Sequence, residues 1–203
     1  MNPKSLEIII SGRVQGVGFR PFVYNLAKKH NIKGFVTNVE KGVLIRALAD
    51  ETVLESFYDQ ILIQKPRSSD ITSSQKRTIL STENFDDFVI KPTAPSLLID
   101  IPLTPDFAIC ESCSNEILNA ENPRYYYPFT TCTQCGPRYS ITKKFPFERI
   151  NNSIDEFTMC ESCSQEYKNS DDIRFHSQTN SCPNCGITLK FTTNSGDIIS
   201  ESN

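Results

Sequence analysis

Apolar and polar side chains alternate near the start of the chain. Apolar residues occupy every second position from Leu6 to Ile10, which is the period of a β-strand with one buried face. A loop with three glycines follows. Pro21 then stands at the expected first position of a helix, where its missing N–H group would have no intrahelical partner. That helix presents an apolar face formed by Phe22, Val23, Leu26 and Ala27.

Similar patterns continue to about residue 90. Apolar residues with helical spacing run from Val53 to Leu62 and predict a second helix that ends before Pro66. Strands are expected at residues 34–39 and 43–49, and a strand at residues 88–90 closes the unit; a weaker strand pattern runs over residues 71–80 and is not counted among the four. The order β-α-β-β-α-β, with four strands and two helices, predicts an α+β, ferredoxin-like sandwich.

The second half of the chain is dominated by a cysteine repeat. All eight cysteines form Cys-x-x-Cys pairs, and adding 50 to each number of the first set gives the second set. Two such pairs supply the four thiolates of a tetrahedral zinc site. We therefore expect two structural zinc ions, held by Cys110, Cys113, Cys132, Cys135, Cys160, Cys163, Cys182 and Cys185.

The spacing leaves the pairing of these ligands open. Sites closed within each repeat are the simplest arrangement, but a nested pairing, first with fourth and second with third, fits the spacing as well. Thiol–disulfide chemistry is less favoured, because it would not need four evenly repeated pairs.

We interpret His176 as a surface or packing residue, and His30 as a charge that complements a helix dipole. The aromatic residues 125–129 are interpreted as apolar cover for a metal site or an interface, rather than a surface for base stacking.

Composition narrows the class of protein. The 203 residues carry a net charge of −3 and only 38% hydrophobic residues, which argues against broad nucleic-acid binding and suits a fold held partly by metal. No apolar run is long enough to span a membrane, and no signal-peptide core is present, so a cytoplasmic protein is expected.

The sequence predicts that the chain is divided into a domain over 1–92, a proline-spaced linker over 93–104, repeats over 105–145 and 155–191, and a polar tail or linker over 192–203.

The loop between the first strand and the first helix is a candidate anion site. Its glycines let successive N–H groups converge, and the helix N-terminus adds partial positive charge. Arg20 supplies a planar cation that phosphate accepts through two hydrogen bonds. Asn38 ends the second strand, and pairing of the two helix-connected strands would bring its amide near the loop, where it could orient a water molecule. On spacing alone, a plain tight turn and an ordinary turn asparagine remain open.

Two segments, residues 12–20 (GRVQGVGFR) and residues 34–42 (GFVTNVEKG), resemble both signatures of the acylphosphatase family. The resemblance implies a loop that holds the phosphate of an acyl phosphate, and an asparagine that positions the attacking water. It therefore implies catalytic roles for Arg20 and Asn38. It also implies phosphate binding by Gln15, Gly16, Val17, Gly18, Phe19 and Arg20.

The cysteine spacing behind this domain narrows the resemblance to the hydrogenase-maturation carbamoyltransferases of the HypF family. The segments 19–24 (FRPFVY) and 127–139 (YPFTTCTQCGPRY) are typical of that family, and the similarity extends over residues 5–190. It implies that carbamoyl phosphate is split here, that a later domain adenylates the carbamate with ATP, and that a last domain passes the carbamoyl group to HypE for the cyanide ligands of the [NiFe] centre. The chain ends at Asn203, before either of those domains, so we do not expect it to complete the transfer alone. The alternative is a non-catalytic, zinc-stapled docking module with a vestigial phosphate loop.

Overall fold

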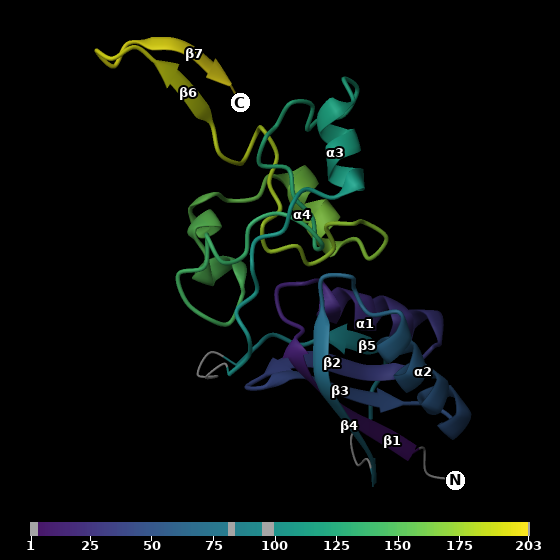
Figure 1. Cartoon of the computed structure of the whole chain (residues 1–203). Coiled ribbons are helices and arrows are strands. Elements are labelled where there is room, and N and C mark those ends of the chain that lie inside the picture. Colours follow the sequence, from purple (N-terminus) through teal and green to yellow (C-terminus); the bar gives the residue numbers. More distant parts are fainter. Residues whose placement is uncertain (1–3, 81–83, 95–99, 203) are drawn as a thin grey trace. The chain divides into compact units, whose positions relative to one another are not determined.

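The computed structural model describes residues 4–80, 84–94 and 100–202 (Figure 1). The chain divides into two compact units. The first consists of Met1–Pro105 together with Lys144–Glu148, and the second of Asp106–Lys143 and Arg149–Asn203. A short segment that lies between the two repeats in the sequence therefore belongs to the first unit.

The first unit is an α+β sandwich, as predicted. Its elements are β1 (Lys4–Arg13), α1 (Phe19–Lys29), β2 (Lys33–Val39), β3 (Gly42–Leu48), α2 (Glu51–Ile63), β4 (Asp70–Leu80) and β5 (Phe88–Ile90). They form a sheet of order β4-β1-β3-β2-β5, in which β5 runs parallel to β2 and the other neighbours are antiparallel. The sheet thus has five strands, because β5 adds to the edge of the four-stranded ferredoxin-like core.

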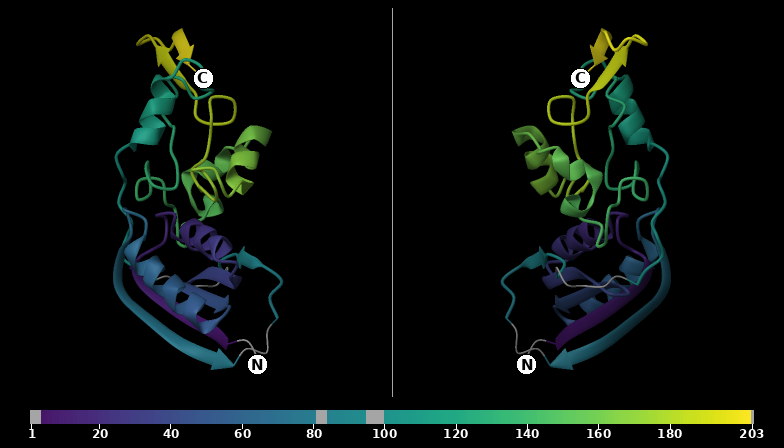
Figure 2. Two further views of the ribbon diagram at one scale, coloured as in Figure 1. Left: turned by 90° about the vertical axis from the view of Figure 1, so that its right-hand side faces the viewer. Right: turned by 90° about the vertical axis from the view of Figure 1, so that its left-hand side faces the viewer.

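Both helices cover the same face of this sheet (Figure 2). Tyr24 of α1 and Phe57 of α2 each make an edge-on ring contact with Phe88 of β5. Phe57 and Phe88 are fully buried. The alternation predicted for β1 reflects this packing, because Ile8 and Ile10 are completely buried.

Two local details differ from the sequence predictions. The helix-connected strands β1 and β2 do not pair, because β3 lies between them and is antiparallel to both. Helix α1 starts at Phe19, two residues before Pro21, and Gly18 is its N-terminal cap with a left-handed φ of 72°. Pro21 is still compatible with the helix, because the N–H groups of the whole first turn lack intrahelical acceptors.

The second unit contains the two repeats. Helices α3 (Glu111–Leu118) and α4 (Glu161–Lys168) each begin directly after the first cysteine of their repeat. Between them lie two short 3₁₀ helices, η1 (Arg149–Asn151) and η2 (Ser153–Glu156). No helix in the described residues is long and apolar enough to cross a membrane.

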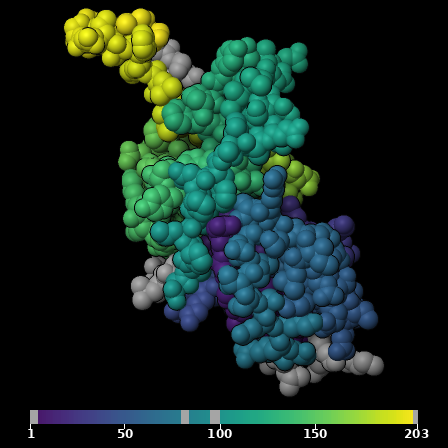
Figure 3. Space-filling model, viewed as in Figure 1, coloured from purple at the N-terminus to yellow at the C-terminus, as the bar shows by residue number. Residues whose placement is uncertain are grey.

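The two segments expected to be linkers contain ordered contacts. The predicted tail over 192–203 instead contributes to a hairpin of β6 (Leu189–Thr192) and β7 (Ile198–Ser202), which stands out from the rest of its unit (Figure 3). In the predicted linker over 93–104, the Asp100 N–H donates to the Glu40 carbonyl at 2.8 Å, and the Thr104 hydroxyl donates to the Gln15 carbonyl at 2.9 Å. Residues 95–99 of that linker lie outside the described residues.

Candidate functional site

The loop between β1 and α1 turns its larger side chains inward. Val17 and Phe19 are buried in the core, with 0% and 1% of their surface exposed. Gly16 and Gly18 have φ values of 73° and 72°, a conformation that glycine adopts without steric cost. Such a loop can contact a ligand through its backbone N–H groups. The N–H groups in the first turn of the following helix also carry partial positive charge. This is the geometry of an anion cradle.

The side chain of Gln15 supports the loop. Its Nε2 donates to the carbonyl of Gly42 at 2.9 Å and to that of Val39 at 3.2 Å, which fastens the loop to the β2–β3 turn. Gln15 is 3% exposed. Any contact between Gln15 and a bound phosphate therefore falls to its backbone N–H group.

Arg20 and Asn38 approach the same hydroxyl group. Nη1 of Arg20, in the first turn of α1, lies 3.4 Å from Oγ1 of Thr93, and Nδ2 of Asn38, on β2, lies 3.0 Å from the same oxygen. Oδ1 of Asn38 is buried and accepts no hydrogen bond from the described residues. A buried acceptor of this kind is costly unless a ligand or water satisfies it. The two residues on which the resemblance depends are therefore brought together at Thr93, and Asn38 keeps a buried acceptor that no described residue satisfies.

Sequence reasoning missed two members of this cluster. The sequence pattern places Thr93 in the predicted linker and Glu148 between the two predicted repeats. Oε1 of Glu148 lies 2.7 Å from Oγ1 of Thr93 and 3.0 Å from Nη1 of Arg20. No signature marks Glu148, which lies 128 residues beyond Arg20 in the sequence. Only the folded chain shows that it belongs here.

The cysteines gather into two clusters, one per repeat. Cys110, Cys113, Cys132 and Cys135 form one set and the residues 50 positions later form the other, with all sulfurs of a set within 4.8 Å of one another. Neighbouring sulfurs are 3.6 Å to 3.7 Å apart. Zinc–sulfur bonds of about 2.3 Å give a tetrahedron with edges of about 3.8 Å. Both clusters therefore fit a tetrahedral metal ion, and the nested pairing does not occur.

The pKa of one buried thiol, that of Cys163, also suits a bound cation. Burial, together with hydrogen bonds to Cys185 and Cys182, raises the pKa of the Cys163 thiol. Loss of that proton needs a compensating positive charge, which a bound metal ion provides. His176 is not part of either cluster, and its ring packs against Tyr167 and Phe175.

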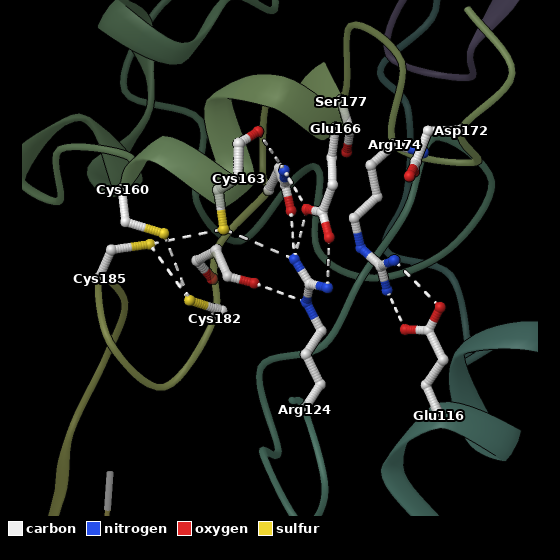
Figure 4. A network of polar contacts seen from close by, with 12 residues as sticks. Glu116, Arg124, Cys160, Cys163, Glu166, Asp172, Arg174, Ser177, Cys182 and Cys185 are labelled. Carbon is white, nitrogen blue, oxygen red and sulfur yellow. Dashed lines mark hydrogen bonds and ion pairs between the residues drawn. The ribbon is translucent and has the colours of Figure 1, made fainter. Parts of the chain in front are cut away.

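Two arginines connect the clusters reciprocally (Figure 4). Arg124 of the first repeat donates to both carboxylate oxygens of Glu166 in the second, at 2.7 Å and 2.6 Å. Arg174 of the second repeat pairs in the same way with Glu116 of the first. The side chains of Arg124 and Arg174 are only 5% and 3% exposed. Each pair is the other shifted by 50 residues, so the two repeats exchange the same contact.

Each arginine also reaches a cysteine of the other repeat. Nη2 of Arg124 lies 3.5 Å from Sγ of Cys163, and Nη2 of Arg174 lies 3.9 Å from Sγ of Cys113. Four thiolates around a divalent ion leave a net negative charge, which a buried guanidinium offsets. Although burial disfavours the charged form of Arg124, Glu166, Cys163 and Glu116 together raise its pKa.

Two family models match the chain, one in each half. The acylphosphatase model matches residues 6–90, and the HypF finger model matches residues 109–142 and 159–192. The first match covers β1 to β5 with the loop and Asn38. The second covers both cysteine clusters.

Known relatives agree with these matches. Over 155 residues the chain is 38% identical to the carbamoyltransferase HypF of a Synechocystis strain, which covers 74% of this chain and 19% of that protein. It is 44% identical to the acylphosphatase of Pseudothermotoga lettingae, over 44% of this chain and 99% of that protein. A crystal structure of full-length HypF in a phosphate- and nucleotide-bound form superposes with a TM-score of 0.86 and 38% identity, over 95% of this chain and 26% of that one.

The chain thus spans about a fifth of the length of the curated HypF relative to which it is compared. Within that length the acylphosphatase domain precedes two HypF fingers, in the order of the two family matches. The chain therefore has the fold and the domain order of the N-terminal part of the HypF carbamoyltransferases, an acylphosphatase-like domain followed by two HypF fingers.

Proposed function

We propose that the chain hydrolyses carbamoyl phosphate, an acyl phosphate, to carbamate and inorganic phosphate. The observation that carries this proposal is the approach of Arg20 and Asn38 to one hydroxyl group beside the glycine loop. The family supports it, since the HypF relatives are carbamoyltransferases and the first domain matches acylphosphatases.

The chemistry requires little of the protein beyond positioning and charge. The guanidinium of Arg20 and the N–H groups of residues 15–20 hold the phosphate and stabilise charge that gathers on its oxygens. The Oδ1 atom of Asn38 accepts a hydrogen bond from a water molecule and holds it in line with the phosphorus. The water oxygen forms a bond to phosphorus, the bond from phosphorus to the bridging oxygen breaks, and its electron pair leaves with carbamate. The two protons of the water remain on the oxygens of the phosphate product.

We place this step at the start of the HypF reaction sequence. A domain that adenylates carbamate with ATP and a domain that transfers the carbamoyl group to a HypE-type acceptor would follow, towards the cyanide ligands of a [NiFe] centre. We also propose that each cysteine cluster holds one structural Zn²⁺, since four thiolates complete the coordination and leave no open position for a substrate.

One observation favours a different function. The Glu148 carboxylate pairs with Arg20 at 3.0 Å, as would suit a docking module whose phosphate loop no longer binds a substrate. The two functions differ in whether the chain releases phosphate from carbamoyl phosphate.

The test compares Arg20→Ala with a matched control, Arg13→Ala. Arg13 lies at the start of the same loop, but its Nε donates to the Ser68 carbonyl at 3.1 Å. We expect phosphate release to fall about 100-fold or more in Arg20→Ala and to stay near the wild-type rate in Arg13→Ala. Equal rates in wild type and Arg20→Ala would reject the enzymatic function and leave the docking module.

A further inference from the structure

A carboxylate beside the phosphate-binding arginine requires an explanation. A phosphate dianion bound by Arg20 would lie close to the negative charge of Glu148, and like charges at such distances repel. Glu148 is nevertheless held in place, because its Oε1 bonds to both Arg20 and Thr93. The preceding residue, Phe147, is buried with 5% of its surface exposed and anchors the backbone there.

The hydrogen bonds around Thr93 have a fixed direction. The Nδ2 group of Asn38 only donates, so it gives a hydrogen to Oγ1 of Thr93 at 3.0 Å. The Glu148 carboxylate only accepts, so the hydroxyl hydrogen of Thr93 goes to Glu148 at 2.7 Å. The site therefore ends in an anionic acceptor, placed beside the groups that we assign to phosphate and water.

An anionic acceptor matches one part of the proposed substrate. The carbamoyl group of carbamoyl phosphate carries an NH₂ with two donors, whereas the acetyl group of acetyl phosphate carries a methyl in the same position. A carboxylate offers about four acceptor positions over its two oxygens. With carbamoyl phosphate, the carboxylate gains a charge-assisted hydrogen bond from the NH₂ group. With acetyl phosphate, the carboxylate lies beside an apolar methyl group and gains no hydrogen bond.

We propose that Glu148 is a specificity-determining residue that accepts a hydrogen bond from the carbamoyl NH₂ group and so favours carbamoyl phosphate over acyl phosphates without N–H donors. This inference rests on the proposed function, since it concerns the substrate of the same site. Thr93 is the positioning residue that links Glu148 to Asn38.

The kinetic test uses the full chain with Glu148→Ala and Glu148→Gln, assayed on carbamoyl phosphate and on acetyl phosphate. We expect Glu148→Ala to lower the ratio of kcat/KM for carbamoyl over acetyl phosphate about tenfold or more, the usual effect of a hydrogen bond to a charged group. Glu148→Gln keeps one acceptor oxygen and should lose less. The matched control is Glu156→Ala, whose carboxylate is 72% exposed and pairs with Lys143, and it should leave the ratio unchanged.

Two kinetic results would overturn the inference. If Glu148→Ala raises kcat/KM for both substrates equally, the Glu148 carboxylate only competes with the phosphate group of the substrate for Arg20. If it lowers both equally, Glu148 only supports the structure. In either case the ratio stays at the wild-type value.

A binding measurement separates this inference from the proposed function. Phosphonoacetamide and acetonylphosphonate are stable analogues that differ only in an NH₂ or a methyl group on the carbonyl. Calorimetry should show that the wild-type chain binds phosphonoacetamide at least about tenfold more tightly than acetonylphosphonate. The Glu148→Ala variant should bind the two analogues with equal affinity. Absence of hydrolysis with this preference intact would refute the proposed function alone. Equal binding of both analogues by the wild-type chain would refute the role of Glu148.

Discussion

At the scale of single residues, the candidate site is only partly visible in the sequence. Glycines and an arginine in one short loop, and an asparagine after a strand, lie within recognisable segments, so Arg20 and Asn38 could be named from the sequence. Thr93 and Glu148 could not, because they are 55 and 128 residues from their partners Asn38 and Arg20. Neither stands in a segment with a pattern of its own. Their contribution depends on how the chain returns to the loop.

Replacing Asn38 tests the water-positioning role. Because its Oδ1 would hold the attacking water rather than the substrate, Asn38→Ala should lower kcat about 100-fold and change KM much less. The control is Thr37→Ala, on the neighbouring position of β2, where the hydroxyl donates to the Pro92 carbonyl. Steady-state hydrolysis of carbamoyl phosphate by both variants measures the difference. A pure rise of KM in Asn38→Ala would instead assign Asn38 to substrate binding.

At the scale of elements, periodicity predicted the strands and helices, but their pairing depended on tertiary contacts. The pattern could not show that β3 lies between β1 and β2, nor that β5 joins the sheet edge. In the second unit, the repeat predicted two alike clusters but not the exchange of contacts between them. A signal existed, because Arg124 and Arg174 are themselves 50 residues apart. The role of these arginines could be understood only from the fold, because each arginine pairs with a glutamate of the other repeat.

The reciprocal arginines should be important for the stability of the second unit. Arg124→Gln leaves the half-buried carboxylate of Glu166 without its cation, which should cost about 3–5 kcal/mol of unfolding free energy. The double variant Arg124→Gln/Glu166→Gln should recover part of that loss. Lys143→Gln is the control, because that lysine is 54% exposed and its ion pair should contribute about 1 kcal/mol or less. Hydrogen exchange in α3 and α4 measures these changes, and equal protection in Arg124→Gln and Lys143→Gln would contradict the role assigned to the network.

Glu7 on β1 makes the first unit sensitive to acid. Its side chain is 5% exposed and pairs across the sheet with Arg46 at 2.6 Å and Arg77 at 2.5 Å. Burial acts to raise the pKa of Glu7, but the hydrogen bonds and charges of the two arginines outweigh it and hold the pKa below the ordinary value of 4.5. A lowered pKa in the folded state adds stability above the unfolded value, and this stability is lost as pH falls through the folded value.

We therefore expect the first unit of the wild-type chain to lose stability as pH falls below 4.5. In Glu7→Gln this contribution is absent, so the decline over the same range should be shallower. Denaturant unfolding at several pH values, followed by sheet circular dichroism, gives the comparison. Parallel pH profiles for the two proteins would show that Glu7 contributes nothing to the acid sensitivity.

At the scale of the whole molecule, composition separates a cysteine-free half from a cysteine-rich half. It could not place the boundary, because prolines and a lack of periodicity suggested a linker where hydrogen bonds attach the segment to the first unit. It also could not assign Lys144–Glu148 to that unit. Contacts of this kind join backbone carbonyls and single hydroxyl groups, which leave no periodic pattern in a sequence.

The two units should respond differently to metal removal. Each cysteine cluster fits one tetrahedral ion, so elemental analysis should find about two zinc ions per chain. Because the folding free energy of such small metal-binding domains comes largely from the metal, a chelator should unfold the second unit and leave the sheet of the first unit intact. Amide exchange in α3 and α4, compared with β1 and β3, distinguishes the two. A content of one zinc or none, or a second unit that survives chelation, would contradict this.

The central claim is that water, held by Asn38, attacks the phosphorus of carbamoyl phosphate bound by Arg20. The most direct measurement is hydrolysis in water enriched in heavy oxygen, followed by mass analysis of the phosphate released. We predict that the wild-type chain releases phosphate that carries one heavy oxygen atom, and that Arg20→Ala does not accelerate its formation. Unlabelled phosphate from the wild-type chain, as expected if carbamoyl phosphate breaks at its carbon–oxygen bond or decomposes to cyanate, would contradict the claim.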